Sequence, residues 1–202
     1  MTRIYAGLAA FGLVAVMGAT VLYTQLASAP NHCEVTVTAG ADIGGPFDLV
    51  NAENLPVTDR DIIDRPALVY FGYTFCPDVC PFDVARNAEA VDLLKAEGLD
   101  IGLVFITVDP ARDTPDVLAD YQFNMHPDLI GLTGTPEQID AAAKAYKVYY
   151  ARGSGEEDYY LIDHSVFTYL MLPGNELATF FRRDMPAETL AEKTACLVRE
   201  MA

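Results

Sequence analysis

The chain has 202 residues, of which 51% are hydrophobic, and it carries a formal net charge of -16 and four cysteines. A chain of this length can bury one core of ordinary domain size. The acidic character argues against a nucleic-acid partner, because few basic side chains are present to neutralise a row of phosphates, and it suits basic proteins or cations instead.

The N-terminal segment is the most apolar part of the chain. Residues 4–26 are almost all apolar or small, and no charged residue occurs between Ile4 and Cys33. At about 1.5 Å of rise per residue, a helix over residues 4–26 is roughly 34 Å long, which is enough to cross a hydrocarbon core of about 30 Å. We therefore expect a membrane anchor over residues 1–27, with Arg3 on the cytoplasmic side and the rest of the chain exported. The alternative is a signal peptide that is cleaved after the small residues 27–29.

Export affects the interpretation of the cysteines, since thiols in an oxidising compartment tend to form disulfides. Residues 28–45 contain proline and glycine breakers and are expected to form a juxtamembrane linker, followed by one domain over residues 46–202. Because chain ends often lie close together, we expect a structural disulfide between Cys33 and Cys196. A buried Cys196 beside an unused Cys33 is the alternative.

Residues 46–202 show the pattern of an α/β domain. Residues 67–73 and 101–108 are short, almost wholly apolar runs, which is typical of strands covered on both faces. Residues 135–138 form a capping box that starts a helix, and residues 173–175 indicate a tight turn. We expect strands at 47–50 and 55–57 (a hairpin), 67–73, 101–108, 166–172 and 176–181, and helices at 81–97, 114–124, 135–146 and 186–201.

This order of elements predicts a central mixed sheet flanked by helices. It is the layout of a thioredoxin-like fold with an N-terminal β-hairpin extension, preceded here by the one predicted transmembrane helix. Periodicity alone supports only the coarser statement, an α/β domain with a mixed sheet.

Two cysteines lie in the segment FCPDVCP (residues 75–81), where a predicted buried strand ends and a helix begins. Sites in α/β sheets are built at this edge. The amides and dipole of the helix N-terminus are expected to lower the pKa of Cys80 and to favour its thiolate. Two soft thiolates on one short loop suit Cu(I) or Zn, or a catalytic redox dithiol made by Cys76 and Cys80. A plain structural disulfide is the alternative, and the spacing does not decide between these.

A third candidate ligand, His164, lies in an Asp-His-Ser segment just before another predicted strand. In thioredoxin-like folds the loop that enters this strand faces the cysteine turn. Two thiolates and one imidazole would make a site able to bind Cu(I), or Cu(II) with a further ligand. The carboxylates of Asp78 and Asp163 are candidates for that further ligand or for a group that orients one. The other histidines, His32 and His126, are expected to be incidental, and His126 to face solvent.

Three separated motifs resemble one family closely. They are YTFCPDVCP (residues 73–81), VDPARDTP (108–115), and DHS (163–165) followed by YL (169–170). In these motifs and their order the chain resembles the Sco/SenC family, whose members are copper-binding assembly factors of cytochrome c oxidase. The resemblance runs from about residue 45 to the last predicted helix.

The resemblance implies a thioredoxin-like fold, a copper site made by Cys76, Cys80 and His164, and a role in metallating the binuclear copper site of cytochrome c oxidase. It implies as partners the copper-bearing subunit of the oxidase, a copper donor chaperone and a thioredoxin-like reductant. With the predicted anchor, it implies a single-pass protein of the inner (cytoplasmic) membrane whose domain faces the periplasm or an equivalent oxidising compartment. The segment around Asp109 and Arg112 is typical of the family, and we expect it to be a structural loop that caps the next helix.

Other functions fit the motifs less well or share them. A thiol–disulfide oxidoreductase would use Cys76 and Cys80 to reduce the cysteines of a partner's copper site, and this remains an open alternative. A peroxidase of the peroxiredoxin kind has a threonine three residues before its reactive cysteine, whereas Tyr73 and Pro77 hold those positions here. A zinc enzyme would need a general base, and no candidate is tied to the site by sequence.

Overall fold

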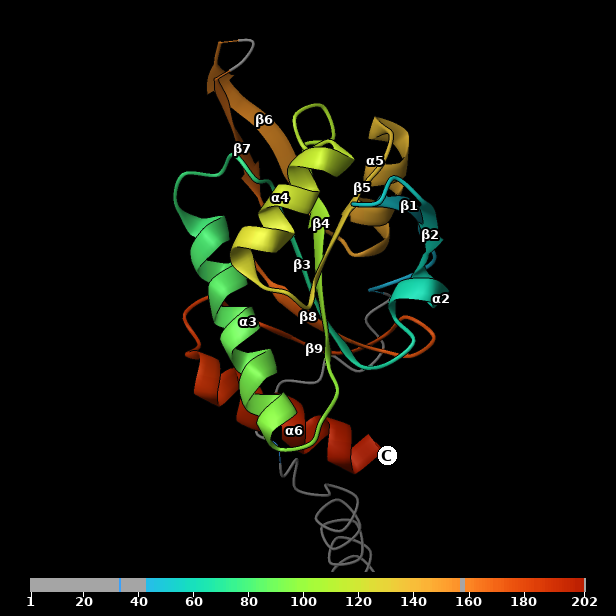
Figure 1. The fold of residues 1–202 in the computed structure, drawn as a ribbon, viewed down its shortest axis with the longest axis vertical. Helices are drawn as coiled ribbons and strands as arrows, with labels where there is room; N and C mark the ends of the chain where they lie inside the picture. The colour runs from blue at the N-terminus through green and yellow to red at the C-terminus, as the bar shows by residue number, and fades with distance from the viewer. Residues whose placement is uncertain (1–32, 34–42, 157–158, 202) are drawn as a thin grey trace, which may run out of the picture. The chain divides into compact units, whose positions relative to one another are not determined.

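The computed structural model describes Cys33 and residues 43–156 and 159–201 (Figure 1). The chain separates into two compact units, Met1–Glu34 and Val35–Ala202. The predicted anchor and nearly all of the predicted linker lie outside the described residues. Within the described residues, every helix is too short or too polar to span a bilayer.

The second unit contains a seven-stranded mixed sheet in the order β2-β1-β5-β4-β3-β8-β9. Strands β3, β4 and β5 pair in parallel, and the remaining pairs are antiparallel. The strands are β1 (Asp48–Asn51), β2 (Pro56–Thr58), β3 (Ala67–Gly72), β4 (Gly102–Thr107), β5 (Leu129–Thr133), β8 (Thr168–Leu172) and β9 (Glu176–Phe181).

Helices cover both faces of this sheet. They are α2 (Asp59–Ile62), α3 (Val79–Ala96), α4 (Pro115–Met125), α5 (Pro136–Ala145) and α6 (Ala187–Met201). Tyr70 and Phe105 are neighbours on β3 and β4, and Phe105 packs against Tyr121 of α4 with ring centroids 5.0 Å apart. Phe71 points to the opposite face, as consecutive strand residues do, and packs against Tyr146 at the C-cap of α5. Figure 1 shows α3 and α4 side by side on the first of these faces.

A separate two-stranded sheet is formed by β6 (Tyr150–Gly155) and β7 (Tyr160–His164). The two strands are antiparallel, and the hairpin projects beyond the main sheet in Figure 1. Its register shifts between Arg152 and Gly155. The hairpin ends at His164, so it carries one of the predicted ligands.

Most elements predicted from the sequence are confirmed to within one or two residues, including the β1–β2 hairpin and β9. The capping box predicted at residues 135–138 is present, with the Thr135 hydroxyl accepting from Gln138 N–H. Three strands were missed, namely β5, β6 and β7. Strand β6 has the sequence YARGSG, whose glycines have low strand propensity, and such a segment is stabilised by pairing rather than by its own sequence.

Candidate metal centre

The two cysteines are placed by a short segment, residues 73–80, that joins β3 to α3 and is called the thiol loop below. The N–H of Cys76 donates to the carbonyl of Tyr73 at 3.2 Å, which closes a turn directly after the strand. Cys80 lies in the first turn of α3, and its N–H lies 3.4 Å from the sulfur of Cys76. Both cysteines are buried free thiols.

Strand β3 ends in a glycine because the first turn of α3 packs directly on it. A Cβ atom at Gly72 would lie 3.1 Å from Cys80 Sγ and 2.9 Å from the ring of Tyr70. Contacts this short are tighter than real side chains normally make. The absence of a side chain at Gly72 therefore lets Cys80 sit against the sheet.

His164 comes to the thiols from the end of β7. Its Nε2 atom lies 3.2 Å from Cys80 Sγ. The imidazole lies nearly perpendicular to two aromatic rings, with centroid distances of 6.2 Å to Tyr70 and 5.9 Å to Tyr73 and interplanar angles of 83° in both cases. The predicted proximity of His164 and the cysteine turn is confirmed, although the histidine ends strand β7 where the sequence predicts a loop.

The hydrogen bonds of His164 define which ring nitrogen faces the thiol. Nδ1 lies 2.9 Å from the carbonyl oxygen of Ser165, which can only accept, so Nδ1 carries the hydrogen. Burial lowers the pKa of His164, which keeps the ring neutral near pH 7. Nε2 therefore presents a lone pair toward Cys80.

The protonation of Cys80 differs from the prediction. The thiol is 0% exposed, and burial raises its pKa rather than lowering it. Desolvation of a thiolate at this depth outweighs the helix dipole. In the metal-free protein the Cys80 S–H can donate to the bare Nε2 of His164, and the site holds a thiol and a neutral imidazole.

A buried carboxylate that was not predicted from the sequence follows Cys80 in α3. Asp83 is 3% exposed and accepts a hydrogen bond from the Tyr70 hydroxyl at 3.0 Å. Its nearest cations are Arg86 at 3.8 Å and Arg183 at 3.9 Å. Burial raises the pKa of Asp83, and these cations oppose that rise. The available signal was a charged residue three positions after Cys80, on the same face of the helix.

A second missed contact ties the thiol loop to the segment after β4. The carboxylate of Asp113 accepts the Thr74 N–H at 3.0 Å, the Thr74 hydroxyl at 2.5 Å and the Thr107 hydroxyl at 2.5 Å. The helix cap expected from this segment is present, because Thr114 caps α4 by accepting from Val117 N–H. Asp113 instead holds the start of the thiol loop.

Cys76, Cys80 and His164 form a group whose ligand atoms all lie within 4.8 Å of one another. A set of two sulfurs and one imidazole nitrogen suits Cu(I) or Zn. A groove of about 270 Å³ opens beside it, lined by Tyr73, Cys76, Pro77, Asp78, Val79, Leu161, Ile162, Asp163, His164 and Val166. Asp78 and Asp163 are exposed along this groove, and among the described residues neither belongs to the ligand group.

The remaining predicted cysteines and histidines lie elsewhere. Cys33 and Cys196 are both disulfide-bonded, in line with the expected structural role. The prediction that His126 faces solvent was wrong, because its side chain is only 12% exposed. Its Nε2 lies 3.3 Å from Asp92, and its Nδ1 accepts the N–H of residue 128. His32 lies outside the described residues.

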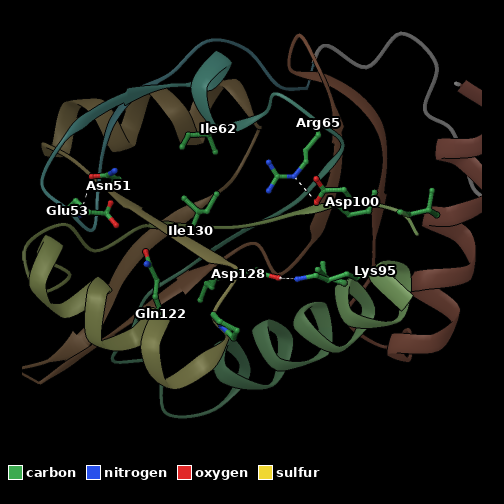
Figure 2. A pocket seen from close by; sticks show the side chains of 14 residues that line it. Asn51, Glu53, Ile62, Arg65, Lys95, Asp100, Gln122, Asp128 and Ile130 are labelled. Atoms are coloured by element: carbon green, nitrogen blue, oxygen red, sulfur yellow. Dashed lines mark hydrogen bonds and ion pairs between the residues drawn. The ribbon is translucent and has the colours of Figure 1, made fainter. Parts of the chain in front are cut away.

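A second hollow, of about 480 Å³, lies near the start of β4 and β5, at the end of the parallel strands that is opposite to the thiol loop (Figure 2). Figure 2 shows its two ion pairs, Arg65–Asp100 at 3.2 Å and Lys95–Asp128 at 2.6 Å. None of the residues that line it is Cys or His. The hollow is therefore a polar surface feature without the chemistry of the thiol site.

Comparison with known proteins gives consistent results. The family model described as SCO1/SenC matches residues 35–199. Protein SenC of Rhodobacter capsulatus is 53% identical over 163 residues, covering 81% of this chain and 74% of SenC. The mitochondrial SCO1 homolog 1 of Arabidopsis thaliana is 39% identical, and the match covers 79% of this chain but only 48% of that longer relative.

Solved structures show the same architecture. The crystal structure of Arabidopsis thaliana ScoI with copper bound superposes with a TM-score of 0.76 at 39% identity, covering 78% of this chain and 99% of that one. The α/β domain with a mixed sheet and flanking helices is therefore the thioredoxin-like fold of these proteins, as predicted.

Proposed function

Since this chain belongs to the SCO1/SenC family, we propose that Cys76, Cys80 and His164 together bind one copper ion and pass it to another protein. The observation that carries the proposal is the convergence of three potential ligand atoms within 4.8 Å of one another. Two come from the thiol loop and one from β7. A relative of the same fold, Arabidopsis thaliana ScoI, has been crystallised with copper bound.

The chemistry of the three groups favours Cu(I). Thiolates are soft ligands that select Cu(I), and a neutral imidazole completes a three-coordinate set. The His164 Nε2 lone pair is available without a proton being lost, because Nδ1 carries the hydrogen. The Cys80 thiol must lose its proton when it binds the metal, so copper binding releases protons and strengthens as the pH rises.

The groove beside the ligands supports a transfer role. Cys76 lines this groove, whereas Cys80 is fully covered. A partner cysteine can approach the metal from the side of Cys76 and replace the protein ligands one at a time. A fully enclosed four-ligand cage would slow such an exchange.

Anaerobic titration of the reduced protein with Cu(I), in competition with a chromophoric chelator, tests the site. We expect wild type to bind about one Cu(I) per chain, and C76S and C80S to lose this binding. In H164A the Cu(I) affinity should fall by more than about 10–100-fold, which is the loss typical of residues that only orient a ligand. H126A is the matched control, because His126 is also mostly covered but lies at the end of α4. Unchanged affinity in H164A would remove the histidine from the site.

A second candidate function is reduction of a partner's disulfide by the same two thiols. Cys76 and Cys80 are free thiols close enough to pair. Cys76 borders the groove and would attack the partner's disulfide, and Cys80 would then resolve the mixed disulfide. One disulfide forms between Cys76 and Cys80, while the partner gains two electrons and two protons as two thiols.

H164A separates the two functions. The dithiol–disulfide exchange uses only the sulfurs, so its midpoint potential in a glutathione redox titration should change little in H164A. Copper affinity should fall in the same variant. Loss of both properties together would indicate that His164 serves the thiols rather than the metal.

The wider role is proposed on the basis of the family. We propose that the protein is anchored by residues 1–27, that residues 28–45 form the linker, and that residues 46–202 form the copper-binding domain outside the cytoplasm. Its copper is proposed to come from a donor chaperone and to reach the binuclear copper site of cytochrome c oxidase, while a thioredoxin-like reductant is proposed to keep the two thiols reduced. Transfer of Cu(I) from the loaded protein to the isolated copper-bearing domain of the oxidase, followed by the spectrum of the binuclear site, tests this destination.

A further inference from the structure

Residues 109–113, called the bridge loop below, follow β4 and are typical of the family without contributing a ligand to the proposed copper site. Asp113 at one end of this loop already holds Thr74 of the thiol loop. The remaining charged side chains of the bridge loop, Asp109 and Arg112, are also mostly buried. Their contacts connect the two ligand-bearing segments.

The guanidinium of Arg112 lies against aromatic rings from both segments. Its central carbon is 5.0 Å from the centroid of Phe75 and 5.6 Å from that of Tyr73, both in the thiol loop. The same atom is 3.7 Å from the centroid of Tyr160, the first residue of β7. A cation within about 6 Å of a ring is attracted to its face. Arg112 therefore contacts both the loop that carries the thiols and the strand that ends at His164.

Asp109 holds this arrangement through both of its carboxylate oxygens. One oxygen is ion-paired with Arg112 Nε, and the other accepts a hydrogen bond from the Tyr160 hydroxyl at 2.7 Å. Asp109 is 3% exposed and the side chain of Arg112 is 14% exposed, so water screens the pair little. The Tyr160 ring is thus held at its face by one residue and at its hydroxyl by the other.

Two further observations favour a positioning role over ordinary packing. The Tyr73 hydroxyl accepts the N–H of Ile162, two residues before His164, at 3.3 Å, so one of the side chains beside Arg112 bonds directly to β7. Arg112 Nη2 is buried without a hydrogen-bond partner among the described residues. Buried donors are seldom left unpaired. The side chain is placed for its flat cationic surface, which a lysine does not offer.

Building on the copper site proposed above, we propose that Arg112, held by Asp109, is a positioning residue that fixes His164 relative to the two thiols. The histidine ends β7 of the two-stranded sheet, whereas Cys80 lies 84 residues earlier in the first turn of α3. The bridge loop joins the two. Residues that orient a metal ligand typically change metal affinity by about 10–100-fold when they are replaced.

The test compares Cu(I) affinity in three variants of the full chain. R112M is expected to lower the affinity by about 10–100-fold. R112K keeps the charge opposite Asp109 but loses the planar surface, and it should fall between R112M and wild type. R152M is the matched control, because Arg152 of β6 also lies over the Tyr160 ring, at 3.8 Å. An equal effect of R112M and R152M would overturn the proposal.

A double-mutant cycle decides whether Arg112 acts through the histidine. In an H164A background, R112M should lower the Cu(I) affinity no further, because the residue that it positions is already absent. The same fold loss in both backgrounds would show action on the thiols or on the whole fold, and would overturn the proposal. Y160F removes only the hydroxyl that donates to Asp109 and carries the test if R112M does not fold. We expect Y160F to lower the Cu(I) affinity less than R112M does. Unchanged Cu(I) affinity in Y160F would contradict the link between Asp109 and Tyr160.

A measurement on the metal-free protein makes the result independent of copper. Hydrogen exchange at the Ile162 amide reports on the link between β7 and Tyr73. We expect this amide to exchange faster in R112M than in wild type or R152M, and unchanged exchange would overturn the positioning role. A wild-type protein that binds no Cu(I) would refute the proposed function, whereas this exchange measurement still decides the role of Arg112.

Discussion

Helix α3 begins at the thiol site and ends beside the larger hollow of Figure 2, and its two ends place charged groups in opposite environments. Near the start of the helix, one turn after Cys80, Asp83 has a side chain that is 4% exposed and accepts a hydrogen bond from Tyr70. In the last turn, Lys95 is paired with Asp128, but their side chains are 65% and 42% exposed. Charged side chains are therefore shielded from water at the thiol end of the helix and solvated at its other end.

The difference shows where a single substitution matters. An exposed ion pair gains little from its partner, because water and salt screen it and both side chains lose freedom. A buried charge depends on its few partners, since water cannot replace them. The following predictions test this contrast between the two ends of α3, beginning with the largest expected effect.

Removal of the buried carboxylate should have the largest effect on stability. In D83A, the Tyr70 hydroxyl loses its acceptor and the mostly buried Arg86 loses a counter-ion. Breaking a buried pair in this way costs about 3 kcal/mol of unfolding free energy. Urea denaturation of the metal-free protein measures this loss. A cost no larger than that of a surface substitution would mean that water reaches Asp83, and the contrast would fail.

A methyl group at the end of β3 should have the next largest effect. G72A places a Cβ atom against Cys80 Sγ and the Tyr70 ring. Overpacking of this kind costs about 1–3 kcal/mol, and the strain is relieved most easily by moving Cys80. We expect lower stability and weaker Cu(I) binding together. Wild-type affinity in a destabilised G72A protein would show that the helix turn shifts without its thiol.

The pH dependence of stability should carry the signature of His164. Burial lowers the pKa of this residue in the folded protein, so the unfolded chain takes up a proton near its ordinary value of 6.5 while the folded chain does not. The stability due to this neutral ring is complete above pH 6.5 and is lost as the pH falls below it, at about 1.4 kcal/mol per unit of pKa difference. Denaturation of metal-free wild type and H164Q between pH 7.5 and pH 5 isolates the contribution. Parallel curves for the two proteins would contradict it.

The smallest effect is expected at the far end of α3. K95M removes an exposed ion pair with Asp128, and it should leave both Cu(I) affinity and the denaturation midpoint close to wild type. Any residual change in stability should disappear in concentrated salt, because the pair is screened. A salt-independent loss comparable with that of D83A would show that the two ends of the helix are not different after all.

Local sequence patterns predicted the elements whose signals lie within one segment. The continuous apolar runs of β3 and β4 and the capping box before α5 required no knowledge of distant residues. The proximity of His164 to the thiols could be predicted only through the thioredoxin-like layout, in which the loop before that strand faces the cysteine turn, because the two segments are 84 residues apart along the chain.

The features that could not be predicted from the sequence depend on burial and on contacts between residues that are far apart along the chain. The dipole at the start of α3 is visible in the sequence, but the complete burial that raises the pKa of Cys80 is not. Asp109 meets its partner Tyr160 across 51 residues, so its position cannot be inferred from spacing. The β6–β7 hairpin was missed for a related reason, since β6 becomes a strand only by pairing with β7.

The proposed ligands are attached to two different sheets, and this division has a mechanical consequence. The thiols are attached to the seven-stranded sheet through β3 and α3, whereas the imidazole lies at the end of the β6–β7 hairpin, which forms a separate sheet. A partner that pulls or tilts this hairpin would withdraw the nitrogen and leave the sulfurs where they are. A bound copper ion would then keep two protein ligands instead of three, and a cysteine sulfur of the partner could take the vacated coordination position.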